Sequence, residues 1–264
     1  MSAPTLPLAP LCALVLSLAV ATRAVSGVTY LQADFDDKPL DQPIGEGGPT
    51  VGEPVEADSP YLTTAVRAAP MPTPSLELTD ISDCCAGYVR FGFLDEAEIT
   101  TGTLVLSADL WIPVTPDESG CSIGLRERES SAFNFADLHF SADGILWCGD
   151  DGGSLGQVGT YSAGMVIHVL IEFNLDAGTY DVRVDDQLLV DDQPHDVVGV
   201  GVGSVLISCT HDPNTGDSYC FDNIFVGDFD PTPVAPPSWG NVKARFGGNE
   251  PADGTPAVPG GGGE

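Results

Sequence analysis

Hydrophobic and polar residues alternate along many short segments of the chain, and this pattern predicts β-strands. Between residues 101 and 112, every even position from 104 onward is apolar, whereas the odd positions carry mostly polar or aromatic side chains. A period of two residues places one set on each face of a strand. Strands are predicted near residues 28–35, 61–68, 75–79, 86–93, 101–112, 121–127, 137–141, 145–148, 158–161, 165–174, 179–184, 187–190, 203–209 and 219–227.

The same alternation gives each predicted strand one apolar face and one mixed polar and aromatic face. In the strand predicted over 165–174, apolar residues at 167, 169, 171 and 173 oppose His168 and Glu172. Two sheets that bury their apolar faces against each other satisfy this pattern. Turns at 142–144, 176–178 and 185–186 separate the strands, so we expect an all-β, two-sheet antiparallel sandwich.

The two ends of the chain differ in character from the segment between them. Residues 5–21 are apolar and uncharged, and small residues that suit a cleavage site follow. We interpret residues 1–24 as a signal peptide and expect a secreted, periplasmic or cell-surface protein without a membrane span. The sandwich is assigned to residues 25–229, and residues 230–264 have the proline- and glycine-rich composition of a linker and flexible tail.

Charge narrows the possible partners. The 264 residues include 39 Asp and Glu against 9 Lys and Arg, which gives a formal charge of −30. This excess repels the phosphates of nucleic acids and the head groups of anionic membranes, so both are excluded as electrostatic partners. Hydrophobic residues make up 42 % of the chain, which is enough for a substantial core.

Cysteine usage predicts disulfides. Of seven cysteines, Cys12 is lost with the signal peptide, and the even number that remains is typical of exported proteins. A zinc site is the rival interpretation, but no CxxC pair stands at finger spacing from a histidine.

Two disulfide pairings follow from the predicted strands. Cys209 ends one strand and Cys220 opens the next, so a hairpin would place these two residues side by side. Cys121 and Cys148 bracket the intervening strands and are predicted to pair across them. The adjacent Cys84 and Cys85 are left either as a vicinal disulfide or as thiols.

Several longer segments resemble a known family. From Tyr161 the chain reads YSAGMVIHVLIEFNLDAGTYDVRVDDQLLVDD, it closes with YCFDNIFVG, and LHFSADGILW stands upstream. These segments resemble the concanavalin A-like (LamG-like) jelly rolls of secreted bacterial proteins. Asp186 replaces the usual turn glycine, and Met165-Val166 replace a common tryptophan. The resemblance implies a jelly-roll fold over about residues 28–229 and carries no catalytic residues.

The resemblance also implies a structural Ca²⁺ where the first and last strands meet. The matching positions are Asp34 or Asp36 in LQADFDD and Asp222 in CFDN. Carboxylate and carbonyl oxygens on adjacent strands suit this hard cation, and the acidity of the chain favours its capture. The alternative is that these residues are solvated acids at strand ends.

Carbohydrate binding is the second candidate chemistry. Sugar sites combine a flat aromatic ring with fixed carboxylate, amide or arginine partners. Trp111 shares a strand face with Asp109, and Arg90 stands on a neighbouring strand, while His139 and Trp147 flank a turn. These five residues are the predicted ligand-binding set, and ordinary amphipathic strand surface is the alternative.

Catalysis is the third candidate. The Glu-x-Asp-x-Glu motif of glycosidases on this fold is absent. The order Arg126-Glu127-Arg128, Asp137-Leu138-His139 and Asp176 to Tyr180 is similar to alginate-lyase-like jelly rolls, but Asp176 replaces their lysine and Tyr180 falls on an apolar face.

We therefore expect a secreted, monomeric, non-catalytic module that binds a glycan or another cell-surface component. A polysaccharide-active enzyme (lyase or glycoside hydrolase) and a purely structural envelope protein are the alternatives.

Overall fold

The computed structural model describes residues 27–228, apart from 45–48, 54, 58–60, 83–84, 115–119, 129–133, 142, 151–152, 196–198 and 210–215. The predicted signal peptide and C-terminal tail lie outside the described residues. Fifteen strands and one short 3-10 turn, Leu94–Glu96, make up the described secondary structure. Within this part of the chain, no helix is long and apolar enough to cross a membrane.

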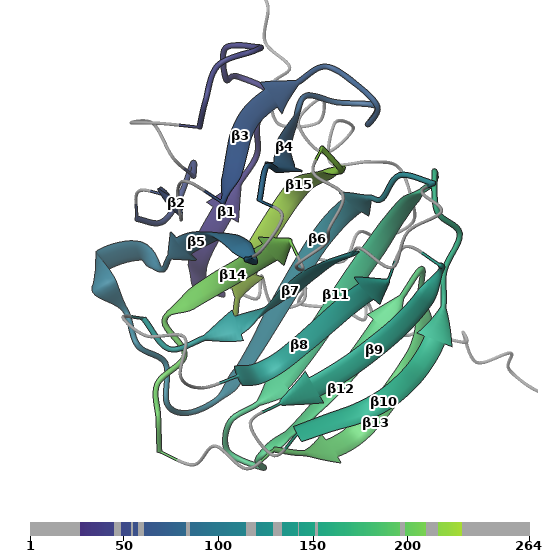
Figure 1. Cartoon of the computed structure of the whole chain (residues 1–264). Coiled ribbons are helices and arrows are strands. Elements are labelled where there is room, and N and C mark those ends of the chain that lie inside the picture. Colours follow the sequence, from purple (N-terminus) through teal and green to yellow (C-terminus); the bar gives the residue numbers. More distant parts are fainter. Residues whose placement is uncertain are drawn as a thin grey trace, which may run out of the picture.

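The strands form two antiparallel sheets that enclose one hydrophobic core (Figure 1). The predicted all-β, two-sheet sandwich is therefore confirmed. The eight-stranded sheet contains, in spatial order, β13 (Gln187–Pro194), β12 (Thr179–Val184), β11 (Val166–Asn174), β6 (Thr103–Trp111), β15 (Ser218–Gly227), β4 (Ser75–Asp80) and β3 (Leu62–Arg67), with β1 (Thr29–Ala33) also paired to β15. The seven-stranded sheet contains β10 (Gly153–Thr160), β9 (Ile145–Asp150), β8 (Asn134–Ser141), β7 (Gly120–Arg126), β14 (Ser204–Cys209), β5 (Gly87–Gly92) and β2 (Val55–Ala57).

Every strand predicted from the alternation is present, with boundaries shifted by a few residues. The predicted inward positions of β6 are fully buried, as the period of two requires: Leu104, Leu106, Ala108 and Leu110. Tyr180 also lies in the core, where its ring stacks on Phe173 with centroids 5.9 Å apart. The sequence missed β2, because its three residues stand in the proline- and glycine-rich segment that predicted a loop.

The turn between β12 and β13 departs from the usual chemistry of a tight hairpin. Asp185 and Asp186 have φ values of 48° and 65°, a region that favours glycine. The Asp185 carboxylate accepts a 2.9 Å hydrogen bond from the backbone N–H of His168 on β11. This cross-strand contact gives Asp185 a role that glycine could not fill.

The two predicted disulfide pairings are wrong. Cys121, Cys209 and Cys220 carry free thiols. Cys209 lies on β14 and Cys220 on β15, and these strands belong to different sheets, which pack roughly 10 Å apart, so the predicted hairpin does not exist. Cys148 lies on β9, two strands away from Cys121 on β7, and its thiol donates to the Tyr180 hydroxyl at 3.9 Å.

Candidate functional site

A row of polar and aromatic side chains crosses the outer face of the seven-stranded sheet. The row follows the strand register, in which each member lies directly opposite the next: Tyr88, Ser208, Ser122, His139, Trp147 and Gln157. Their chain neighbours, such as Leu138, Phe140 and Leu146, point into the core and are fully buried. The row therefore faces outward, and Trp147 is 39 % exposed near its end.

A groove of about 340 Å³ lies beside the end of this row, where the edge strands of the two sheets meet. Figure 1 shows these strands, β10 and β13, running side by side at the margin of the sandwich. The groove is lined by Gln157, Val158, Gly159 and Thr160 of β10 and by Gln187 and Leu189 of β13. Because Gln157 is the cross-strand partner of Trp147, the exposed indole and the amides border one surface.

His139 lies next to Trp147 in the row and is half-buried. Burial lowers the pKa of its imidazole, although the nearby Asp137 carboxylate acts in the opposite direction. The ring is therefore neutral at pH 7, since its ordinary pKa is already 6.5. A neutral imidazole offers one donor and one acceptor, which suits a hydroxyl-bearing ligand.

Three arginines lie on β5, at the end of β7 and just after β7 in the same sheet, and protein contacts hold them in place. Arg126, 4 % exposed, pairs with Asp137 at 3.2 Å, and Arg128 pairs with Glu96 at 3.1 Å. Arg90 donates to the Arg128 carbonyl at 3.1 Å, and its guanidinium stands 5.7 Å from the centre of the Tyr88 ring. Arg90 is also buried, whereas Trp147 is exposed. A ligand at the outer face would therefore reach Trp147 more readily than Arg90.

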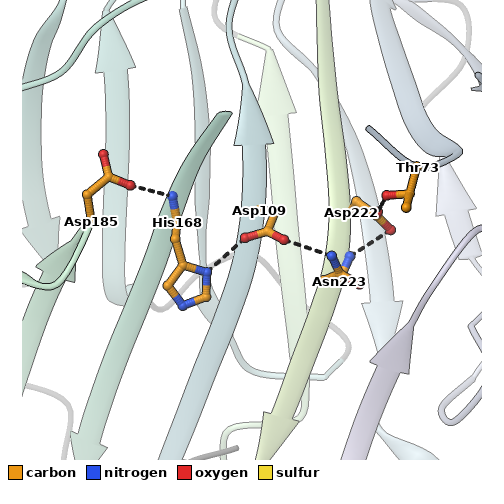
Figure 2. A network of polar contacts seen from close by, with 6 residues as sticks. All are labelled: Thr73, Asp109, His168, Asp185, Asp222 and Asn223. Carbon is orange, nitrogen blue, oxygen red and sulfur yellow. Dashed lines mark hydrogen bonds and ion pairs between the residues drawn. The ribbon is translucent and has the colours of Figure 1, made fainter. Parts of the chain in front are cut away.

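Asp109, also predicted to bind ligand, belongs to a polar network on the eight-stranded sheet (Figure 2). One carboxylate oxygen lies 2.8 Å from Nδ1 of His168, and the other accepts a 2.7 Å hydrogen bond from the Asn223 amide. Asn223 reaches Asp109 because β15 is bulged between Asp222 and Phe225, where Asn223 adopts φ 52°. Both oxygens of Asp109 are therefore engaged within the protein.

The contact between His168 and Asp109 leads to a prediction of how the stability of the fold depends on pH. The hydrogen bond to Asp109 raises the pKa of His168 above 6.5, although partial burial acts against the charged ring. A raised folded-state pKa stabilises the fold below the unfolded pKa, and this contribution is lost as pH rises through the folded pKa. Because His168 is 38 % exposed, the contribution is about 0.2–1 kcal/mol.

Urea unfolding at pH 6 and pH 8 tests this prediction on the wild type and His168→Gln. The wild type is expected to lose more stability between these two values than the variant does. His139→Gln is the matched control, because its folded-state pKa is lowered and its removal does not reduce that loss. Equal losses in the wild type and His168→Gln would contradict the assignment.

Asp222 lies on β15 close to its pairing with β1, the region where the family resemblance implied a cation site. Ala33 of β1 is opposite Ile224 of β15, and the Asp222 side chain is 1 % exposed. It accepts hydrogen bonds from the Thr73 hydroxyl at 2.5 Å and from the backbone N–H of Asn223 at 2.8 Å. Burial, with smaller contributions from Asp34 and Asp36, raises its pKa to about 6.

The five predicted ligand residues do not form one surface. Arg90, His139 and Trp147 lie on the outer face of the seven-stranded sheet, whereas Asp109 and Trp111 lie on the opposite, eight-stranded sheet. Gln157 and Gln187 are not among the predicted ligand residues, because their groove exists only where the edges of two different sheets meet. Of the lyase-like set, Tyr180 is buried in the core and Arg126 is paired with Asp137.

Comparison with known proteins shows a fold likeness at low sequence identity. No family model matches the sequence, and no curated protein matches it. Among solved structures, a sialidase aligns with a TM-score of 0.51 and 14 % identity over 78 % of this chain and 20 % of its own. Trypanosoma rangeli sialidase in complex with sialic acid aligns with a TM-score of 0.50 and 14 % identity over 78 % of this chain and 31 % of its own.

A carbohydrate esterase from the Shiga toxin-encoding bacteriophage phi24B aligns over 76 % of this chain and 98 % of its own, with a TM-score of 0.49 and 10 % identity. Whereas the alignment covers nearly all of the esterase, the chain spans only about a fifth to a third of the length of the two sialidases. At such identities the sialidase likeness shows the fold alone.

Proposed function

We propose that this chain is an exported, non-catalytic carbohydrate-binding module with a concanavalin A-like jelly-roll fold. A saccharide would bind at the Trp147 surface, which comprises Trp147, His139 and the groove between β10 and β13. The observation that carries the proposal is the exposed indole of Trp147 directly opposite Gln157, which lines that groove. An aromatic face and fixed hydrogen-bonding groups are the two elements that saccharide recognition needs.

The chemistry of the Trp147 surface favours a neutral saccharide. Gln157, Gln187 and Thr160 offer amide and hydroxyl groups, which match sugar hydroxyls as both donors and acceptors. The formal charge of −30 disfavours the approach of an anionic polymer. The fold likeness to sialidases adds support for a carbohydrate-related role, as does the export that residues 1–24 predict.

A binding panel tests the proposal directly. The purified chain is titrated against neutral oligosaccharides and, in parallel, against uronic acid-containing ones, with and without millimolar Ca²⁺. Saturable binding of a neutral member is expected. Absence of binding to every member of the panel would overturn the proposal and favour a structural role. Release of shortened oligosaccharides would instead identify an enzyme.

We further propose that Ca²⁺ binds where β1 and β15 meet, with Asp222 and Asp34 or Asp36 as carboxylate ligands. The burial and raised pKa of Asp222 support a cation here, because a bound charge would offset the cost of ionising a buried acid. Among the described residues, no group of three or more His, Cys, Asp or Glu is placed to hold a metal ion. Backbone carbonyl oxygens would therefore complete the coordination.

The proposed calcium site predicts that a chelator lowers the thermal stability of the protein. A ligand at ten times its Kd stabilises the folded state by about 1.4 kcal/mol, which is about 3–6 °C in Tm for a domain of this size. Removal of Ca²⁺ by a chelator is expected to lower the Tm of the wild type by this amount and to leave Asp222→Ala unchanged. Thr73→Val, which removes only the hydroxyl contact to Asp222, is the matched control and is expected to remain chelator-sensitive. A wild-type Tm that does not respond to chelation would reject the calcium site.

A further inference from the structure

Two buried cysteines stand directly opposite each other in the middle of the seven-stranded sheet. Cys121 of β7 is the register partner of Cys209 of β14, and both are fully buried. Directly opposite residues of an antiparallel pair project to the same face of the sheet, which here is the core face. The two side chains are therefore neighbours. Burial is the main cause that raises the pKa of the Cys121 thiol, and Cys209 and Cys220 raise it further.

The spacing of opposed residues suits a disulfide. In an antiparallel ladder, directly opposite residues have Cα atoms roughly 4.5–5.5 Å apart. The Cα atoms of disulfide-bonded cysteines are usually roughly 4.4–6.8 Å apart. The backbone of β7 and β14 therefore already holds Cys121 and Cys209 within bonding range.

The other described cysteines are placed less well to reach Cys121 or Cys209. Cys148 is separated from Cys121 by β8, so two strand spacings of roughly 4.8 Å each exceed the limit of about 7 Å. Cys220 belongs to the opposite sheet, roughly 10 Å away. Cys85 stands two residues before Gly87, the partner of Cys209, and such a diagonal separation is roughly 7–8 Å.

We propose that Cys121 and Cys209 are an oxidation site that forms an intrasheet disulfide when the chain folds in the presence of a disulfide oxidant. The thiolate of one cysteine attacks the oxidant's S–S bond, which gives a mixed disulfide and releases one thiol. The second thiolate then attacks the protein sulfur of that mixed disulfide and releases the other thiol. The two cysteines lose two electrons and two protons, and the oxidant is reduced to two thiols.

Burial determines when the bond can form. It raises the pKa of Cys121 and of Cys209 in the folded protein, so little thiolate is present there and the oxidant has no access. The exchange therefore takes place while β7 and β14 are pairing and the second sheet has not yet covered them. Once formed, the disulfide joins two adjacent central strands that come from distant parts of the chain. Its formation does not depend on any ligand.

Peptide mapping tests the pairing directly. The full chain is refolded from denaturant in a glutathione redox buffer, alkylated without reduction, and digested with trypsin. Cleavage after Arg and Lys leaves Cys121 alone in peptide 91–126 and places Cys209 and Cys220 in peptide 184–243. The expected product is a cross-link between these peptides that persists in Cys220→Ala and disappears in Cys209→Ala.

A cross-link that disappears in Cys220→Ala, or one that joins Cys209 to peptide 68–90, would overturn the pairing. Alkylation of both Cys121 and Cys209 in the refolded wild type would overturn the disulfide itself.

Thermal unfolding provides a second readout. A reductant is expected to lower the Tm of the oxidised wild type and of Cys220→Ala by about 5–15 °C. The Tm of Cys209→Ala, compared with and without reductant, is expected to stay constant. If the reductant shifts Cys209→Ala as much as the wild type, another bond is responsible and the proposal fails.

Discussion

Replacing Trp147 with alanine is expected to weaken binding of the preferred neutral oligosaccharide about 10- to 150-fold, a loss of about 1.4–3 kcal/mol. The indole is 39 % exposed and lies directly opposite Gln157, which lines the groove together with Gln187, so its ring is available for a sugar to stack on. Tryptophan residues in such positions commonly contribute a large share of the binding free energy. Isothermal titration with the saccharide chosen by the panel measures the effect.

Trp111→Ala is the matched control for this experiment. Trp111 lies on β6 in the eight-stranded sheet and so occupies the opposite side of the sandwich from Trp147. The Trp111→Ala variant is expected to bind the saccharide with wild-type affinity. Measuring the Tm of both variants checks that they fold. Gln187→Ala, which removes an amide from the groove, is expected to weaken binding by a smaller factor. Loss of binding in Trp111→Ala with retention in Trp147→Ala would place the site on the eight-stranded sheet.

The fold could be predicted because its signal is local. Alternation of apolar residues places Leu104 and Leu106 inside β6, and it needs no knowledge of which strand lies beside it. Strand pairing across the sandwich has no such signal, and this is why the cysteine pairings failed. Cys209 and Cys220 are near in sequence, yet the chain passes from one sheet to the other between them.

The candidate site shows the same limit. Trp147 and His139 were found because they alternate with core residues on adjacent strands, whose register was implied by the turn between them. Gln157 and Gln187 stand on edge strands of different sheets, so only the assembled sandwich reveals their groove. Asn223 reaches Asp109 through a β-bulge, a backbone feature that the alternation of side chains does not encode.

Gly124 of β7 occupies a position in the seven-stranded sheet where any side chain would collide with its surroundings. A Cβ atom there would lie 2.4 Å from the Ala136 backbone oxygen, 2.8 Å from Nη1 of Arg126 and 2.9 Å from Oδ1 of Asp137. Contacts below 3.0 Å force neighbouring atoms to move, and the Ala136 oxygen belongs to the backbone of β8. The absence of a side chain at Gly124 thus leaves room for the Arg126–Asp137 pair.

Gly124→Ala is expected to reduce the free energy of unfolding by about 3–5 kcal/mol. Overpacking contributes about 1–3 kcal/mol, and separating the buried guanidinium of Arg126 from Asp137 adds a further cost of a few kcal/mol. The total free energy of unfolding of such domains is only about 5–15 kcal/mol, so the variant would lie close to its unfolding threshold. Urea titration at pH 7 measures the change.

Gly159→Ala is the matched control, because its new methyl group would meet only side-chain carbons, the nearest being the Leu189 methyl groups at 3.1 and 3.2 Å. Those flexible ends can move, so a loss below about 1 kcal/mol is expected. Similar losses in Gly124→Ala and Gly159→Ala would show that the general cost of a methyl group in this sheet, rather than the Arg126–Asp137 pair and the β8 backbone, sets the requirement for glycine. A large loss confined to Gly124→Ala would instead locate that requirement at the Arg126–Asp137 pair and the β8 backbone, on the strand that also carries His139.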